Sequence, residues 1–214
     1  MKILFIGNSY TFYHEMPKLF EALCRANGKD VEVDSVTKGG RKLYENLASG
    51  DENNSKILEL LKTEHYDVLF LQEHSCGPLL AEERFISAVG ELKALVGADR
   101  TILYETWGRK TGSKTLEEHS WTSEQMFEDI IGSYVKCAEL NSTELSRVGE
   151  CFKTLLRESD AELYTEDRSH PSLFGSSVAA LSHYKTVFGE YPKTTEPLDL
   201  GDYADIVKKT VESV

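Results

Sequence analysis

The sequence predicts an α/β protein: a three-layer α/β/α sandwich in which a parallel sheet of about five strands carries helices on both faces. Two observations lead to this prediction. Short apolar segments alternate along the chain with longer segments whose apolar residues recur every three or four positions. In addition, the most apolar short segments are hydrophobic throughout, as strands are when both faces of a sheet are covered. A chain of 214 residues without an evident linker or repeat is expected to form one domain, residues 1–214.

Five short segments are expected to form the strands of this sheet. The first contains an unbroken apolar run, and the third is apolar until it ends in Gln72. An apolar strand with a polar end is typical of a central parallel strand whose carboxyl end opens onto a ligand site. The second segment alternates between apolar and polar residues, which indicates a position nearer the sheet edge. The expected strands span residues 2–6, 31–37, 67–72, 100–106 and 142–148.

Amphipathic segments between these strands are expected to form the helices. In the first of them the apolar side chains recur at helical spacing, and an Asn-Gly pair supplies the stop. The expected helices span residues 13–27, 55–63, 81–96, 118–139, 149–159, 172–188 and 202–211. The polar stretch from Gly108 to Glu118 contains two glycines and is predicted to be a mobile loop.

The charge balance restricts the expected partners. The chain has 36 acidic and 24 basic residues, a formal net charge of −12, and no segment concentrates lysine and arginine. Nucleic acids and anionic membranes are therefore not expected as partners, because both require a basic surface. The same charge favours a neutral or cationic small-molecule substrate, unless Lys38, Arg41 and Arg109 together form a locally positive entrance. The sequence indicates no particular oligomeric state.

The cysteines and the hydropathy pattern indicate a location. No run approaches the roughly 18 apolar residues of a membrane span, and the apolar start of the chain is too short for a signal peptide. The four cysteines are scattered and form no CxxC pair, so we expect reduced thiols. A cytoplasmic location follows as an expectation. The cysteines are Cys24, Cys76, Cys137 and Cys151.

The first candidate for chemistry is Ser9, in the turn that follows the first strand. Its segment, residues 7–11, reads Gly-Asn-Ser-Tyr-Thr. A serine at a sharp strand-to-helix turn can expose its hydroxyl above the sheet, and the backbone amide beside it can point at a developing oxyanion. The alternative is that a serine or threonine here only caps the next helix.

The second candidate is the pair Asp167 and His170, just before the helix expected at 172–188. A serine nucleophile needs a base within hydrogen-bond reach, and the base needs a carboxylate to orient it. An aspartate three residues before a histidine can supply both from one tight loop, and Pro171 then suits the start of a helix. Alternatively, Asp167 and Ser169 only cap this helix, and His170 is a surface residue.

The third candidate is a set of hydrogen-bond donors for an oxyanion. Gly39 and Gly40 follow the second strand, and glycine lets backbone amides approach a substrate closely. Gln72 ends the central strand, and its side-chain amide could donate to the same oxygen. In the plainer interpretation the glycines form a turn and Gln72 is bonded to its neighbours. Chance would then have to place suitable residues on four separate loops at one sheet edge.

With these residues the chain resembles the SGNH (GDSL-type) hydrolases over nearly its whole length. The resemblance assigns the nucleophile to Ser9, the oxyanion-hole glycine to Gly40, and the orienting acid and base to Asp167 and His170. Two departures stand out. Asparagine replaces the aspartate of the name-giving motif before the nucleophile, and residues 71–75, Leu-Gln-Glu-His-Ser, replace the usual Gly-x-Asn-Asp block. The chain therefore looks like a divergent branch with a Gly-Asn-Ser first block, in which Gln72 stands for the family asparagine.

The resemblance implies an esterase that hydrolyses small acyl esters through an acyl-enzyme, without a metal or cofactor. His170 would take the proton of Ser9, and Asp167 would hold the imidazole. The amides of Ser9 and Gly40, together with the side chain of Gln72, would stabilise the oxyanion. The family implies acetyl groups on carbohydrates as substrates. We expect Tyr10, Gly39 and Trp107 to contribute to the substrate site.

Other interpretations of the same residues remain open at this point. A metal hydrolase could use Glu73, His74, Asp167 and His170 as ligands. His14 is a rival base to His170 on spacing. An α/β-hydrolase is disfavoured because its nucleophile lies in a Gly-x-Ser-x-Gly turn well inside the chain. A different class is a non-catalytic binding module on a flavodoxin-like scaffold, with a phosphate or sugar held at residues 7–11.

Overall fold

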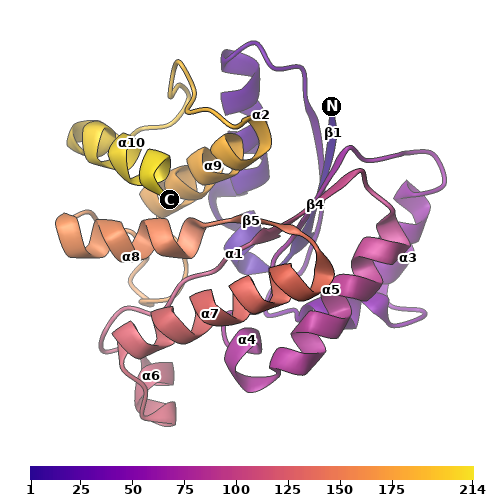
Figure 1. Ribbon diagram of the computed structural model, residues 1–214, viewed down its shortest axis with the longest axis horizontal. Coiled ribbons are helices and arrows are strands. Elements are labelled where there is room, and N and C mark those ends of the chain that lie inside the picture. The colour runs from indigo at the N-terminus through magenta and orange to yellow at the C-terminus, as the bar shows by residue number, and fades with distance from the viewer.

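The computed structural model describes all 214 residues and contains one parallel sheet with the strand order β2-β1-β3-β4-β5 (Figure 1). Every strand pair is parallel, and helices cover both faces of the sheet. The predicted three-layer α/β/α architecture with about five strands is therefore confirmed. The strands are β1 (Lys2–Gly7), β2 (Glu32–Thr37), β3 (Val68–Leu71), β4 (Arg100–Tyr104) and β5 (Glu144–Ser146).

Two apolar layers hold the helices against the sheet. Alternate residues of each strand enter opposite layers, so Phe5 and Phe70 lie in one layer and Leu4 and Leu69 in the other. Helices α2, α8, α9 and α10 cover the first face, and α3, α5 and α7 cover the second (Figure 1). The helices are α1 (Ser9–Phe12), α2 (Met16–Ala26), α3 (Glu52–Leu60), α4 (Gly77–Leu80), α5 (Glu82–Val96), α6 (Lys114–His119), α7 (Ser123–Asn141), α8 (Val148–Glu158), α9 (Leu173–Phe188) and α10 (Ala204–Ser213).

Local backbone geometry explains where the observed helices differ from the expected ones. The helix expected from residue 13 begins at Met16, because His14 and Glu15 both have a φ of 52° and form a left-handed turn. The helix expected over 118–139 begins only at Ser123, as α7, because Ser120, with a φ of 55°, ends the short helix α6, which lies mostly within the predicted loop of residues 108–118. Thr122 then caps the amino terminus of α7 through a hydrogen bond from the Gln125 N–H.

The stretch from Gly108 to Glu118, predicted to be a mobile loop, is tied to the segment that precedes α9. Tyr164 donates its hydroxyl to the Gly108 carbonyl at 2.6 Å, and the Lys110 N–H donates to the Arg168 carbonyl at 3.0 Å. The Arg168 guanidinium donates to the Gly112 carbonyl at 2.8 Å. Its position is therefore coupled to the loop that carries the predicted histidine and aspartate.

The strand register brings the carboxyl ends of the four longest strands to one edge of the sheet. Gly7 of β1 lies opposite Thr37 of β2, and Leu71 of β3 is paired with both Ile6 of β1 and Leu103 of β4. The segments that follow these strands contain most of the residues that the sequence singled out. A parallel sheet of this kind places its ligands at this edge.

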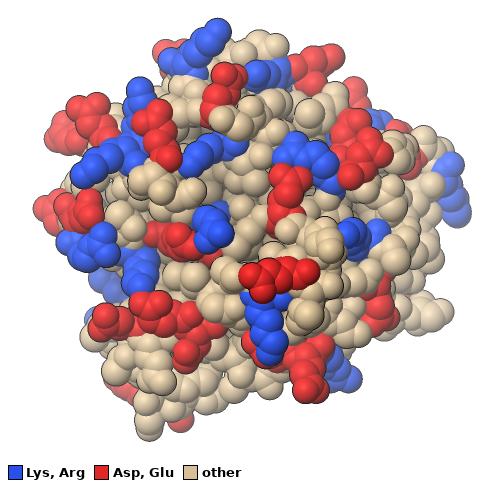
Figure 2. All heavy atoms as spheres, in the orientation of Figure 1, with Lys and Arg blue, Asp and Glu red and all other residues tan.

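The surface is mixed in charge on the face shown in Figure 2. There lysine and arginine are interspersed with aspartate and glutamate, and no large basic patch forms. Several charged side chains of the protein make ion pairs, such as Lys136 with Glu82 and Lys110 with Glu162. None of the helices combines the length and the hydropathy that crossing a bilayer requires. All four cysteines are buried and free.

Candidate active site

Ser9, His170 and Asp167 form one hydrogen-bonded series at the carboxyl edge of the sheet. His170 Nε2 lies 2.8 Å from Ser9 Oγ, and His170 Nδ1 lies 2.5 Å from Asp167 Oδ2. An ionised carboxylate can only accept hydrogen bonds, so the ring nitrogen that faces it, Nδ1, carries the proton. Nε2 is then free to accept a hydrogen bond from the serine hydroxyl. This is the arrangement in which a histidine can activate a serine as a nucleophile.

The turn after β1 holds Ser9 above the sheet. Asn8 is the N-cap of α1, and its side-chain oxygen accepts a hydrogen bond from the Tyr10 N–H at 3.1 Å. Gly7 is required here because a Cβ would lie 2.4 Å from Thr11 Oγ1. As the first residue of α1, Ser9 has a backbone N–H without an intrahelical acceptor, which leaves it available to an incoming oxygen.

The loop before α9 holds the imidazole from two sides. Asp167 Oδ1 accepts the backbone N–H groups of Ser169 and His170, each at 2.9 Å, while Oδ2 takes the ring. Burial alone would raise the pKa of Asp167, but the hydrogen bonds from the His170 ring and from these N–H groups outweigh it and hold the pKa well below its usual range. Tyr13 stacks on the imidazole with ring centroids 4.3 Å apart. The carboxylate thus stays ionised and the ring stays oriented.

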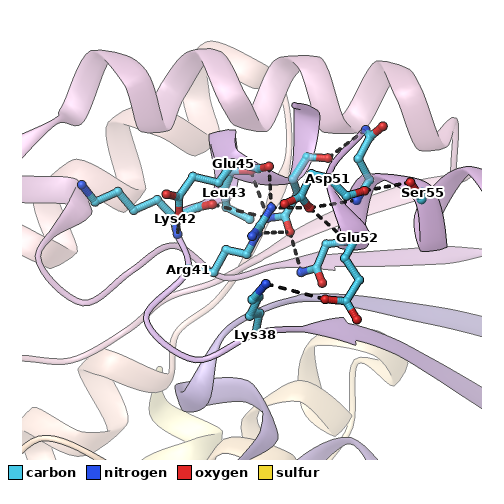
Figure 3. A network of polar contacts seen from close by, with 11 residues as sticks. Lys38, Arg41, Lys42, Leu43, Glu45, Asp51, Glu52 and Ser55 are labelled. Carbon is cyan, nitrogen blue, oxygen red and sulfur yellow. Dashed lines mark hydrogen bonds and ion pairs between the residues drawn. The ribbon is translucent and has the colours of Figure 1, made fainter. Parts of the chain in front are cut away.

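Gly40 lies on an exposed loop that a polar network attaches to the nucleophile turn. Asn8 Nδ2 donates to the Arg41 carbonyl at 2.9 Å, so the loop runs beside Ser9. Figure 3 shows the Arg41 guanidinium among its partners: it pairs with Asp51 and donates to the Glu45 carbonyl at 2.6 Å. Gly40 itself has a φ of 67°, which glycine adopts without strain. The carbonyl and side chain of Arg41 therefore anchor the loop next to Gly40.

Gln72 does not serve as the predicted oxyanion donor in this structure. Its Oε1 accepts the Asn8 N–H and the Thr11 hydroxyl, both at 2.9 Å, and its amide nitrogen donates to the Glu73 carbonyl. The side chain is buried at 1% exposure. Gln72 instead fastens the end of β3 to the nucleophile turn, because two donors from that turn take its oxygen.

Trp107 and Tyr10 do not line the substrate site as predicted, because neither presents a surface to a substrate. Trp107 is fully buried and stacks between Tyr10 and Phe152, with ring centroids 4.6 and 4.1 Å apart. Its indole N–H donates to the Ser169 carbonyl. Tyr10 is 3% exposed, and its hydroxyl lies 2.7 Å from Ser169 Oγ. Both aromatic residues therefore hold the histidine loop in place through their hydrogen bonds to Ser169.

Gly39 and His14, the other residues singled out in the sequence, lie near the site without contacting Ser9. Gly39 is exposed beside Gly40, with open space around its α-carbon. His14 is exposed, and its Nε2 lies 3.2 Å from the Pro171 carbonyl rather than at Ser9, so His170 is the histidine that meets the serine. No group of three His, Cys, Asp or Glu side chains is arranged to hold a metal ion.

Glu73 is a site-adjacent residue whose role the sequence did not reveal. Its carboxylate is buried and makes no ion pair, and it accepts the His74 N–H at 2.6 Å and the Leu43 N–H at 3.3 Å. It thereby joins the segment after β3 to the segment after Gly40. Burial raises the pKa of Glu73 to about 7. Only the unusual third block pointed to it, and a sequence pattern carries no information on burial of this kind.

The raised pKa of Glu73 predicts a pH-dependent stability. A carboxyl whose pKa is higher in the folded than in the unfolded chain stabilises the fold fully below about pH 4.3, and this contribution is lost as the pH rises through 7. Relative to Glu73→Gln, the wild-type free energy of unfolding should fall by about 3 kcal/mol between pH 4.5 and 8, as measured by urea denaturation. Glu83→Gln, an exposed change of equal charge, should show no such trend. Parallel pH profiles for wild type and Glu73→Gln would contradict the assignment.

The fold and the site together define the class. No family model matches the sequence, and no curated protein matches it either. The parallel sheet, with a serine after β1 and an Asp-x-x-His loop before the last long helix of the sandwich, has its structural neighbours among the SGNH hydrolases and esterases. The resemblance seen in the sequence is thus confirmed at the level of the fold.

Three neighbours illustrate the similarity. A proposed SGNH hydrolase from Slackia heliotrinireducens is 29% identical, with a TM-score of 0.78 over 87% of this chain and 98% of that chain. A DUF4886 family protein from Bacteroides uniformis is 18% identical, with a TM-score of 0.78 over 100% of this chain and 92% of that chain. A variant of an acetyl-xylooligosaccharide esterase from Geobacillus is 15% identical, with a TM-score of 0.64 over 90% of this chain and 96% of that chain.

Proposed function

We propose that this protein is a serine esterase that hydrolyses small acyl esters, acetyl esters of carbohydrates among them. The observation that carries the proposal is the continuous series from Ser9 Oγ through the His170 ring to the Asp167 carboxylate. This series lies at the sheet edge where an open α/β sheet binds its ligands. The fold shared with SGNH hydrolases and esterases supports the same assignment.

The proposed reaction is an acyl transfer in two steps. Ser9 Oγ attacks the ester carbonyl while His170 Nε2 takes the hydroxyl proton, and Asp167 stabilises the resulting imidazolium. The N–H groups of Ser9 and Gly40 donate to the oxyanion. As the tetrahedral intermediate collapses, His170 gives its proton to the leaving alcohol and the acyl group stays on Ser9. Water, deprotonated by His170, then releases the carboxylic acid and restores the serine.

The choice of a small acyl group rests on a neighbour and on the exposure of the site. One structural neighbour is named as an acetyl-xylooligosaccharide esterase, which suggests the same class of substrate here. Ser9 is only 9% exposed and the His170 side chain 25%, so an ester has to reach a largely buried nucleophile, which favours a small acyl group. A cytoplasmic location is part of the proposal, supported by the four free, buried cysteines.

The test is a comparison of ester turnover with covalent labelling. Wild-type protein is assayed on 4-nitrophenyl acetate, butyrate and octanoate and on acetylated sugars by acetate release, and it is treated with a fluorophosphonate probe. We expect labelling of one serine, identified as Ser9 by peptide mass spectrometry, and the highest kcat/KM on the short acyl chains. A protein that neither labels nor turns over any ester between pH 5 and 9 would refute the esterase and leave a binding module.

Arg41→Ala tests whether the network in Figure 3 positions the Gly40 amide. The change removes the ion pair to Asp51 and the hydrogen bond to the Glu45 carbonyl, and should lower stability by about 1–3 kcal/mol. Because the oxyanion donor then loses its fixed place, kcat on 4-nitrophenyl acetate should fall about tenfold with little change in KM. Lys38→Ala on the same loop, where the lysine is exposed and paired with Glu52, is the control. Loss of stability with an unchanged kcat would exclude this role for Arg41.

A further inference from the structure

Arg109 is an arginine with a fixed backbone and an incompletely bonded side chain. Its N–H donates to Met126 Sδ at 3.4 Å, and its carbonyl accepts the Ser123 hydroxyl at 2.6 Å. Both contacts come from the region where α7 begins, so the point from which the side chain extends is held in place. Positioning of this kind is what a recognition residue needs, because little conformational entropy is left to lose on binding.

The guanidinium of Arg109 has no anionic partner within the protein. Its Nη2 donates to Ser75 Oγ at 3.1 Å, and its Nε is shut off from water and has no hydrogen-bond partner. Arg84 and Arg168 also lack an anionic partner, but Arg84 lies over the ring of Tyr44 and Arg168 donates to the Thr111 and Gly112 carbonyls. Among the buried side-chain nitrogens of this protein, only this Nε and Nε2 of His183 lack a hydrogen-bond partner.

The contacts of Arg109 place it beside the proposed catalytic residues. Ser75, its hydrogen-bond partner, belongs to the segment after β3, at the same sheet edge as Ser9. The residue after Arg109 contacts the loop that carries the histidine, because the Lys110 N–H donates to the Arg168 carbonyl at 3.0 Å. Arg109 therefore lies between the segment after β3 and the loop that carries the histidine.

We propose that Arg109 binds a carboxylate group of the ester substrate, so that the preferred substrates are monoanionic esters. This inference rests on the proposed esterase activity and names the substrate class of that same site. The planar guanidinium can give two parallel hydrogen bonds to the two oxygens of a carboxylate. Ser75 would hold one hydrogen of Nη2, while the other hydrogens of the two amino groups, Nη1 and Nη2, donate to the ligand and Nε stays buried. This is the locally positive feature that the net charge of the chain conceals.

The carboxylate can belong to the acyl part or to the alcohol part of the ester, and two matched substrate pairs distinguish these sources. For the acyl part, mono-4-nitrophenyl succinate is compared with 4-nitrophenyl butyrate. For the alcohol part, 4-acetoxybenzoate is compared with phenyl acetate. We expect wild-type protein to prefer the anionic member of one pair by about 10- to 100-fold in kcat/KM, mainly through a lower KM.

Variants of Arg109 test whether that preference comes from this side chain. Arg109→Gln and Arg109→Ala should bring the anionic-to-neutral ratio of kcat/KM close to one. Arg109→Lys, which keeps the charge but not the two-donor fork, should retain only part of the ratio. Lys110→Ala is the matched control, because it removes one positive charge from the adjacent residue, which is partly exposed and pairs with Glu162. The control should keep the wild-type ratio.

The outcomes separate this inference from the proposed function. If wild-type protein hydrolyses the neutral esters and shows no preference for the anionic ester of either pair, the inference is refuted and the esterase assignment stands. An equal loss of preference in Arg109→Gln and Lys110→Ala would also refute it, since a general field rather than a binding contact would then be responsible. Failure to hydrolyse any of the four esters, with no fluorophosphonate labelling, would refute the esterase itself. Circular dichroism melts verify that each variant is folded.

Discussion

Ser9→Ala is expected to lower kcat on a short aryl ester by at least about a thousandfold and to abolish labelling by a fluorophosphonate. The hydroxyl 2.8 Å from His170 Nε2 is the only atom in the series that can form the acyl-enzyme, so its removal leaves the base without a nucleophile. The measurement is the initial rate on 4-nitrophenyl acetate, together with the mass shift of the labelled protein.

His170→Ala should cause a loss of similar size, because a serine hydroxyl without its base is a poor nucleophile. Ser87→Ala, at an exposed serine of α5, is the control for an unspecific effect of losing a hydroxyl. Labelling of Ser9→Ala at another residue, or a His170→Ala variant with wild-type turnover, would show that the assignment is wrong. His14 would then be the histidine to test, although in this structure it contacts the Pro171 carbonyl.

Asp167→Asn is expected to lower kcat by about four orders of magnitude near neutral pH while the protein remains folded. The asparagine amide can donate to Nδ1, which favours the tautomer with the proton on Nε2, and this tautomer cannot accept the Ser9 hydroxyl. An asparagine also cannot stabilise the imidazolium. The measurement is the pH profile of kcat for wild type and variant on the same acetate ester.

The direction in which pH changes the stabilisation by the wild-type Asp167 carboxylate follows from its pKa. Because the pKa of Asp167 is held below its usual range, the stabilisation by its carboxylate is present above the unfolded pKa of about 4 and is lost only as the pH falls further. In wild type, activity near neutral pH should therefore not be limited by protonation of Asp167. An Asp167→Asn variant within tenfold of wild type at pH 7 would mean that another group orients the histidine.

The periodicity of the sequence was sufficient to predict the sheet, because a strand with both faces covered must be apolar throughout. The run from Ile3 to Ile6 and the run from Val68 to Leu71 are both fully buried and adjacent in the sheet. Element ends were predicted less well. The start of α2 depends on two consecutive left-handed residues, His14 and Glu15, and neither residue type identifies such a turn.

The residues brought together at the candidate site were also predicted from the sequence, for a topological reason. Ser9 follows β1, Gly40 follows β2, and parallel strands end at the same edge, so both residues reach one region of the surface. Asp167 and His170 lie on one tight loop, and their spacing allows the carboxylate to reach the ring. Short-range spacing, and the position of a residue directly after a predicted strand, can be read from the sequence itself.

The roles of Gln72, Trp107 and Tyr10 were predicted wrongly because they depend on depth and on competing partners. An amide at the end of a central strand is equally suited to face a substrate or to accept bonds from a neighbouring turn, and here Asn8 and Thr11 take it. An aromatic residue near a motif can line a cleft or fill the core, and Trp107 is fully buried. Neither choice leaves a trace in the local pattern.

The amino-acid pattern alone thus established the α/β/α architecture, the strand-end position of Ser9 and the pairing of Asp167 with His170. These depend on periodicity and on spacing along the chain. The packed chain was needed to show that Gln72 is buried, that Arg41 anchors the Gly40 loop, and that Arg109 has no acidic partner. These properties depend on which groups from distant segments meet and on how much water is excluded between them. Such contacts are made by the whole fold rather than by any one segment.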